Sequence, residues 1–190
     1  MANTIKNEIK QLLQLPDELV EVFLSKFTPQ SIAKGTYYLS EGEFCNQIAI
    51  VQQGAFYSFY TKEDKEIIED FCFEGCYISD YPSFIKGIPV KKNFKALEDS
   101  QLLVISKTEL EKLYKLDCQF EKAGRLVAEN LFASWEQKVR EVILLTPIER
   151  YKNIITKRKE VLQRVPLYII ASYLNITPEY LSQIRRKITS

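Results

Sequence analysis

The stretch that most limits the fold of this chain is residues 117–145. It contains one glycine, Gly124, and no proline, so nothing in it breaks a helix. Apolar residues recur in it at steps of three and four, which is the spacing of one helix face. The members of this apolar stripe are Phe120, Val127, Leu131, Trp135, Val139 and Val142. We therefore predict one long helix, and a chain of 190 residues has room for a small core at each of its ends.

The apolar stripe has two interpretations. In the first, the helix packs along its own domain. In the second, the stripe is longer than a small β unit can cover, and the same helix of a second subunit covers the excess. The length of the stripe favours the second interpretation and predicts a homodimer.

Residues 31–106 follow a different pattern, in which glycines punctuate alternating apolar and polar residues. Short runs of β-branched or aromatic residues bounded by turn residues predict strands. These runs are residues 47–51, 55–60 and 102–105. Residues 62–65 predict a hairpin tip, and Gly42 and Gly54 predict tight turns. The pattern is typical of a small all-β unit.

A compact helical unit is expected after the long helix. Thr146 and Pro147 end the long helix, because proline lacks the backbone donor and restricts the residue before it. Residues 148–161 are amphipathic and basic and predict one helix. Pro166 predicts the start of another, and residues 177–179 the start of a third.

Composition excludes several classes of enzyme. The chain has no histidine, so Ser-His-Asp and Cys-His catalysis and zinc sites with histidine ligands are impossible. The carboxylate pairs Glu69-Asp70 and Glu98-Asp99 do not suggest catalysis either, because neighbours in a strand point to opposite faces. Solvated turns explain these pairs. We expect no enzyme, no metal site and no cofactor.

The four cysteines and the N-terminus bear on location. No run approaches the roughly 18 to 20 apolar residues of a membrane helix, and residues 1–13 lack the pattern of a signal peptide. We therefore expect a cytoplasmic protein that does not enter a membrane. Reduced and mostly buried thiols are expected in that compartment. The cysteines are Cys45, Cys72, Cys76 and Cys118.

Charge is divided unevenly along the chain. Residues 1–145 contain 17 Lys and Arg against 22 Asp and Glu, whereas residues 146–190 contain 9 against 3. The net charge of +1 therefore conceals an acidic part of −5 and a basic part of +6. The basic part is where a polyanion would bind.

Residues 167–184 carry the most specific local pattern, that of a helix-turn-helix. Ala171 is small where two crossing helices approach, and Asn175 tolerates left-handed φ in the turn. Thr177 and Pro178 are a helix cap and a first helical residue, followed by an acidic residue in the first turn. Apolar residues stand where a shared core requires them, at Ile170, Leu174, Ile176, Leu181 and Ile184.

The outward face of the second helix follows by subtraction and consists of Pro178, Glu179, Ser182, Gln183 and Arg186. Glu179 can accept from cytosine N4, Gln183 can pair with adenine, and Arg186 can reach guanine or phosphate. Four other residues are better placed for phosphates, namely Thr177, Tyr180, Arg185 and Lys187. The alternative is that residues 185–187 are a solvated charge run. The complete pattern favours double-stranded DNA as a partner.

The β unit, the long helix and the helix-turn-helix together resemble the Crp/Fnr family of transcription regulators over essentially the whole chain. Segments that look like the strand-and-glycine pattern of its cyclic-nucleotide-binding β-roll are residues 34–42, 48–54, 69–75 and 96–100. The resemblance implies an α+β fold. It would have a double-stranded β-helix, or jelly roll, in residues 1–116, a dimerisation helix in 117–145 and a DNA-binding domain in 146–190. It also implies RNA polymerase as a partner, and the architecture is similar to short Bacteroidetes members.

The resemblance fails at the nucleotide contacts. The Gly-Glu pair of nucleotide-binding members falls on Ser79 and Asp80, and their Arg-Ser/Thr-Ala triplet falls on Val90, Lys91 and Lys92. The phosphate-binding arginine is absent, and lysine cannot reproduce its bidentate fork. We therefore expect no response to cyclic AMP. The five residues remain a candidate pocket for an unknown small effector, in which Asp80 holds a hydroxyl and the lysines hold another anion or only solubilise the surface.

Two further departures concern cysteines and chain length. The dispersed cysteines lack the spacing of the family's iron-sulfur members. The sequence ends just after the second helix of the motif, so backbone contacts are expected to depend more on Arg150, Lys152, Lys157, Arg158 and Lys159. The sequence thus predicts a sequence-specific DNA-binding regulator. The alternative, a ligand-binding regulatory module without DNA binding, does not need the basic C-terminal part.

Overall fold

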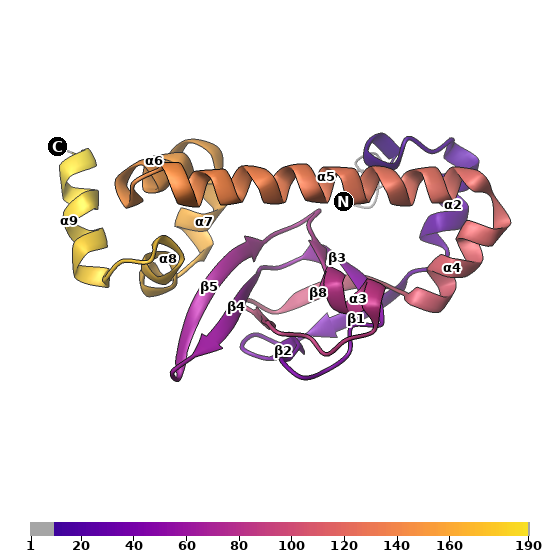
Figure 1. Cartoon of the computed structure of the whole chain (residues 1–190), viewed down its shortest axis with the longest axis horizontal. Coiled ribbons are helices and arrows are strands. Elements are labelled where there is room, and N and C mark those ends of the chain that lie inside the picture. The colour runs from indigo at the N-terminus through magenta and orange to yellow at the C-terminus, as the bar shows by residue number, and fades with distance from the viewer. Residues whose placement is uncertain (1–9, 190) are drawn as a thin grey trace.

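The structure is a computed structural model that describes residues 10–189. Part of the N-terminal segment used above to judge export, residues 1–9, lies outside the described residues. Two four-stranded antiparallel sheets form a β-roll, and helices lie at both ends of a long helix that runs alongside it (Figure 1). This arrangement confirms the predicted fold class of a β-sandwich domain, a long helix and C-terminal helices.

The first sheet has the order β1-β8-β3-β6 and the second the order β2-β7-β4-β5. The strands are β1 Thr28–Ile32, β2 Tyr37–Leu39, β3 Gln47–Gln53, β4 Phe56–Lys62, β5 Lys65–Cys72, β6 Tyr77–Ile78, β7 Asn93–Ala96 and β8 Ser100–Ser106. The three predicted strand segments lie in β3, β4 and β8. Lys62 pairs with Lys65 across the predicted hairpin tip, where Glu63 and Asp64 have φ of 50° and 58°.

Gly54 is required between β3 and β4. Its φ is +110°, and a Cβ at this position would lie 2.8 Å from the Cα of Ser100. A side chain would therefore meet both backbone strain and a backbone clash. The predicted tight turn at Gly54 is confirmed.

The roll has apolar residues on both faces of its first sheet. Inside the roll, Phe56, Phe94 and Leu102 pack with Phe84 of helix α3 (Tyr81–Lys86). On the outer face, helices α2 (Asp17–Leu24), α4 (Lys107–Leu116) and the first turns of α5 (Cys118–Leu144) cover Ile50 and Ile105. Burial on two faces explains why β3 and β8 contain apolar runs.

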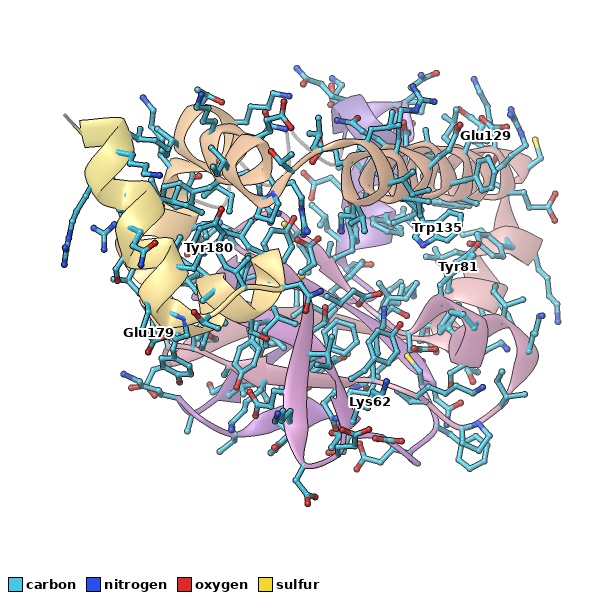
Figure 2. All side chains as sticks on the ribbon, turned by 60° about the vertical axis from the view of Figure 1, so that its left-hand side comes forward. Lys62, Tyr81, Glu129, Trp135, Glu179 and Tyr180 are labelled. Atoms are coloured by element: carbon cyan, nitrogen blue, oxygen red, sulfur yellow. The ribbon has the colours of Figure 1, made fainter. Side chains whose placement is uncertain are left out.

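The long helix α5 confirms the predicted helix, but its apolar stripe is divided. Phe120 is buried against its own domain, where its ring stacks on Phe23 of α2 with centroids 6.4 Å apart. Its expected place in a dimer interface is therefore wrong, since α2 already covers it. Leu131, Trp135 and Val142 are exposed on the second half of α5, and Figure 2 labels Trp135 there.

The C-terminal unit contains four helices, α6 Pro147–Lys157, α7 Lys159–Arg164, α8 Leu167–Leu174 and α9 Pro178–Thr189. The single helix predicted for residues 148–161 is wrong, because the chain breaks at Arg158, whose φ is −137° and ψ is 56°. The Arg158 guanidinium forms hydrogen bonds with β5 of the roll, and the periodicity of nearby residues does not predict such a long-range contact.

Within residues 10–189, no helix has the length and apolar character needed to cross a membrane.

Candidate nucleic-acid interface

Helices α8 and α9 are joined by the three-residue turn 175–177. Asn175 has φ 58° and ψ 44°, the left-handed conformation predicted for it. The turn is closed by hydrogen bonds from Asn175 N to Ser172 O (2.9 Å) and from Ile176 N to Ala171 O (3.0 Å). Figure 1 shows α8 nearly end-on and α9 along its length, so the two axes cross steeply.

A shared apolar core fixes α9 on α8. Each residue of this core is exposed by 1% or less. The residues are Ile170, Ala171 and Leu174 of α8 and Leu181 and Ile184 of α9. Thr177 Oγ1 accepts a hydrogen bond from Tyr180 N (3.2 Å) and so caps the start of α9. The buried face of α9 is therefore the one that the spacing predicted.

The opposite face of α9 is exposed, and its members are Pro178, Glu179, Ser182, Gln183 and Arg186. Figure 2 shows Glu179 at the edge of the molecule. Its own backbone N–H and then the Thr177 hydroxyl lower the pKa of Glu179, so it remains an ionised acceptor at neutral pH. The residues predicted to contact phosphates, Thr177, Tyr180, Arg185 and Lys187, are also exposed. The structure thus brings all nine predicted residues together on one helix and its cap.

The C-terminal unit is docked on the roll through an apolar core that continues across both. Phe59, Ile68 and Phe71 of the roll pack with the buried residues of α6 to α9. Ser172 Oγ of α8 donates to Glu66 O of β5 (2.8 Å). Sequence reasoning missed this core, because no local pattern relates residues so far apart in the chain.

Two arginines reinforce the docking. Arg158 donates to Asp70 Oδ1 (2.8 Å) and to Phe71 O (3.0 Å). Arg164 makes parallel hydrogen bonds to Glu98, both at 2.9 Å, and to Glu74, at 2.6 and 3.0 Å. Arg158 was expected to contact the DNA backbone, but its guanidinium instead bonds to Asp70 and Phe71 of the roll.

Two of the carboxylates that meet these arginines, Asp70 and Glu74, have lowered pKa values. Burial by itself would raise the pKa of Asp70, but Arg158 and then Lys138, which also pairs with it, hold that pKa below its usual value. Hydrogen bonds from Arg164 lower the pKa of Glu74 to about 2. Part of the acidic excess of the roll therefore neutralises part of the basic excess of the C-terminal unit.

The explanation by solvated turns is wrong for Glu69 and Asp70, which lie in a strand and are partly buried. Glu98 and Asp99 do lie in the turn between β7 and β8, where Asp99 is exposed. Glu69 and Asp70 lie in β5, where the pairing with β4 shifts register, and they meet different partners. Glu69 contacts Lys92 (2.9 Å), whereas Asp70 contacts the C-terminal unit. Asp99 accepts from the Lys34 backbone N–H (2.8 Å). The carboxylates therefore hold the molecule together.

The five residues of the candidate effector pocket do not form one site. Asp80 is buried and its carboxylate caps α3 by accepting from Ser83 N (2.9 Å). Val90 is 2% exposed in the core of the roll, whereas Lys91 is on the surface. The hydroxyl of Ser79 lies 3.4 Å from Cys45 Sγ.

Lys92 is the one member of this set whose charge lies on a polar cluster of the roll. Its Nζ is 2.9 Å from Glu69 Oε2, which also accepts from Ser58 Oγ (2.9 Å). Tyr60 donates to the other oxygen of Glu69 (3.3 Å), and burial, followed by Glu69, raises the pKa of Tyr60 to about 12. An internal carboxylate thus already neutralises this lysine.

A cavity of about 470 Å³ lies outside the roll, between α3, α4 and α5. Its lining is mainly apolar and includes Phe84, Leu110 and Val127. Ser79 lines this cavity, but Asp80 and residues 90–92 are not among its walls.

The four cysteines differ in exposure, since Cys45 is buried, Cys72 and Cys76 are half-buried, and Cys118 is exposed. The expectation of burial is therefore wrong for Cys118.

Comparison with known proteins shows what the roll is similar to. Residues 29–117 match the family model of the cyclic nucleotide-binding domain. This part of the chain is therefore similar to domains of the cyclic nucleotide-binding type. No curated protein sequence matches the chain.

Solved structures of low identity show the same overall fold. The catabolite activator protein of Thermus thermophilus is 17% identical with a TM-score of 0.60, over 92% of this chain and 84% of that one. The c-di-GMP responsive global regulator CLP of Xanthomonas campestris is 16% identical with a TM-score of 0.68, over 92% of each chain. FixK2 of Bradyrhizobium japonicum is 21% identical with a TM-score of 0.66, over 86% of this chain and 84% of that one.

Proposed function

We propose that this protein is a sequence-specific DNA-binding transcription regulator of the Crp/Fnr type. The observation that carries the proposal is the geometry of α9, whose apolar face is buried on α8 and whose opposite face is polar and exposed. A helix held in this way can enter the major groove, where base edges carry a unique pattern of donors and acceptors. The names of the structural neighbours, an activator protein and a global regulator, support the same class.

Binding to promoter fragments tests this function. A fluorescence anisotropy titration should show a preferred duplex bound about 10³-fold or more tightly than random duplex, with affinity falling as salt rises. Glu179→Ala and Gln183→Ala should reduce the preference for that duplex. Gln163→Ala, an equal change on the exposed surface of α7, is the matched control. Binding without sequence preference and without salt dependence would reject the proposal.

Residues that bind phosphates are expected to behave differently from those that bind bases. Lys187→Ala should weaken binding to all duplexes alike, and the salt slope should fall by about 0.9 for each phosphate that the variant no longer neutralises. Lys115→Ala on α4 is the control, because Lys115 is also exposed but lies away from the C-terminal unit (Figure 1).

The second half of α5 is proposed as the dimer contact, which would place two α9 helices on one operator. Leu131, Trp135 and Val142 are between 42% and 61% exposed. Apolar side chains exposed together in one stripe are typical of a surface that contacts another protein. Trp135→Glu should convert a dimer to a monomer in sedimentation equilibrium, whereas Gln119→Glu on the same helix should not. A wild-type monomer at micromolar concentration would contradict this assignment.

Cyclic AMP is not proposed as the effector. The position of the phosphate-binding triplet offers a buried valine, a surface lysine and Lys92, which Glu69 already neutralises. A cyclic phosphate would have to displace that carboxylate, and lysine would bind it as a point charge without a bidentate fork. Thermal shift with cyclic AMP should therefore show no stabilisation at micromolar concentrations, and a clear shift would overturn this part of the proposal.

A further inference from the structure

The cavity of about 470 Å³ between α3, α4 and α5 takes no part in the proposed DNA interface. Its floor is apolar, since Phe84, Ile105 and Phe120 line it and are 4% exposed or less. It opens to solvent beside α3, where Tyr81 and Ile85 also line it and are 39% and 53% exposed. Figure 2 labels Tyr81 on this side of the molecule, below α5. A small molecule can therefore reach the apolar floor.

The volume and the lining of the cavity match those of small-molecule sites. Such sites have volumes of roughly 300–1,000 Å³ and combine a mainly apolar wall with a few polar groups that orient the ligand. The wall here is mainly apolar as well. Its polar members among the described residues are three tyrosines, one serine and two charged residues, namely Tyr77, Tyr81, Tyr114, Ser79, Lys107 and Glu111.

Gly124, the one glycine of the long helix, makes room for one of these tyrosines. Glycine in a helix interior costs about 1 kcal/mol relative to alanine, so a packing reason is expected for it. A Cβ at this position would lie 2.5 Å from the hydroxyl oxygen of Tyr114 and 3.0 Å from its Cζ. Gly124 and Tyr114 both line the cavity. The missing side chain thus lets α4 and α5 form a continuous wall.

Lys107 places a positive charge in this wall. It is half-buried, its Nζ donates to Phe84 O (2.7 Å), and it lies over the Phe84 ring, 5.4 Å from the centroid. An ammonium group has three donors, so two remain for a ligand. Among residues 10–189 no carboxylate forms an ion pair with Lys107, and Glu111, one turn along α4, is exposed.

The position of Lys107 in its helix increases this positive potential. Lys107 is the first residue of α4, where the helix dipole is positive and anions are preferred over cations. Glu109 in the same turn pairs with Lys112 rather than with Lys107. The cavity therefore combines an apolar floor with a cation that has no anionic partner in the described part of the chain.

We propose that this cavity binds a monocarboxylic acid with an apolar chain, whose carboxylate pairs with Lys107 and whose chain covers the apolar floor. Medium-chain fatty acids are the simplest members of this class. A neutral apolar molecule would leave the ammonium without a counter-charge, and a small inorganic anion would leave the apolar floor in water. The proposal rests on the cavity and does not depend on DNA binding.

Calorimetric titration of the delipidated full chain tests the ligand class. Octanoate, decanoate and dodecanoate are titrated below the concentrations at which they form micelles, and at least one should bind with one molecule per chain. The alcohol of the same length should bind about ten-fold or more weakly, because it lacks the charge-assisted hydrogen bond.

Lys107→Met keeps a long unbranched side chain and removes its charge. It should weaken binding of the acid about ten-fold or more and leave binding of the alcohol unchanged. Lys112→Met, at an exposed site on the same helix that does not line the cavity, is the matched control and should bind as wild type does. Equal affinity for acid and alcohol, unchanged by Lys107→Met, would overturn the carboxylate class.

Two further variants test the location of the ligand. Leu110→Trp should fill the cavity from α4 and abolish binding of acid and alcohol alike, with a melting curve to verify the fold. Ile85→Glu changes an exposed residue at the opening and should weaken binding of the acid about ten-fold by repulsion. Full binding to a folded Leu110→Trp variant and to Ile85→Glu would place the ligand elsewhere and overturn the site.

A second copy of the chain is the competing occupant, because Leu131 belongs both to the cavity wall and to the proposed dimer contact. The Trp135→Glu variant, expected to be monomeric, separates the two. Equal binding of the acid to wild type and to Trp135→Glu would support the ligand site. Binding to Trp135→Glu alone would show that the second copy covers the cavity, and no binding to either would show that the cavity takes no such acid. Both of these outcomes would overturn the proposal.

Discussion

The basic residues of α9 and those of α6 and α7 belong to the same positively charged part of the chain but face different partners. Arg185, Arg186 and Lys187 lie on the exposed side of α9, at the end of the molecule. Arg158 and Arg164 instead bond to carboxylates of the roll. The difference teaches that an excess of basic residues in one part of a sequence does not by itself show how basic the binding surface is. Some of these basic residues form ion pairs with carboxylates of another unit of the same chain.

The strongest test of this comparison removes an inward arginine. Arg158→Met should lower the free energy of unfolding by about 3 kcal/mol, because Asp70, whose side chain is only 18% exposed, would have one cationic partner fewer. Urea unfolding followed by circular dichroism measures the change. Lys159→Met alters the next residue, which is exposed, and should cost less than about 0.5 kcal/mol. Equal effects of the two variants would show that the Arg158 contacts do not contribute to stability.

An outward arginine should show the opposite behaviour. Arg186→Ala should weaken binding to the preferred duplex by about 2 kcal/mol, as expected when an arginine that binds guanine is removed. Its unfolding free energy should change by less than about 0.5 kcal/mol, because Arg186 is exposed. Anisotropy titrations and urea unfolding of the same preparation separate the two quantities. Arg125→Ala on α5 is the control, and a weakening that is equal for random duplex would assign Arg186 to a phosphate instead.

The contrast also shows what the sequence could predict. The exposed face of α9 follows from local rules, since Asn175, Thr177 and the spacing of Leu181 and Ile184 determine which side is buried. The strands, the hairpin tip and the long helix follow from equally local patterns. Each of these features depends on residues within a few positions of one another.

The docking of the two units could not be predicted in the same way. Arg158 lies in an amphipathic basic run that suggests one continuous helix, and its partner Asp70 is 88 positions away. Glu69 and Asp70 suggest a polar turn until the strand pairing places them in β5. Phe120 fits the dimer stripe by period but meets Phe23 of α2 in space. Periodicity identifies an apolar or charged face, but not the element that covers it.

The smallest expected effect concerns the second inward arginine and depends on pH. Hydrogen bonds from Arg164 lower the pKa of Glu74 from 4.5 to about 2. Since the folded state binds this proton more weakly than the unfolded state, Glu74 stabilises the fold above about pH 4.5 and loses this contribution as pH falls toward 2. The side chain of Glu74 is 43% exposed, so solvent screening limits the contribution to less than about 1 kcal/mol.

Melting temperatures of wild type and Glu74→Gln should therefore differ at pH 7 and converge near pH 2. Glu160→Gln, at an exposed site on α7, should follow wild type throughout. A gap between wild type and Glu74→Gln that stayed constant down to pH 2 would mean that the Arg164 contact does not depend on the charge of Glu74.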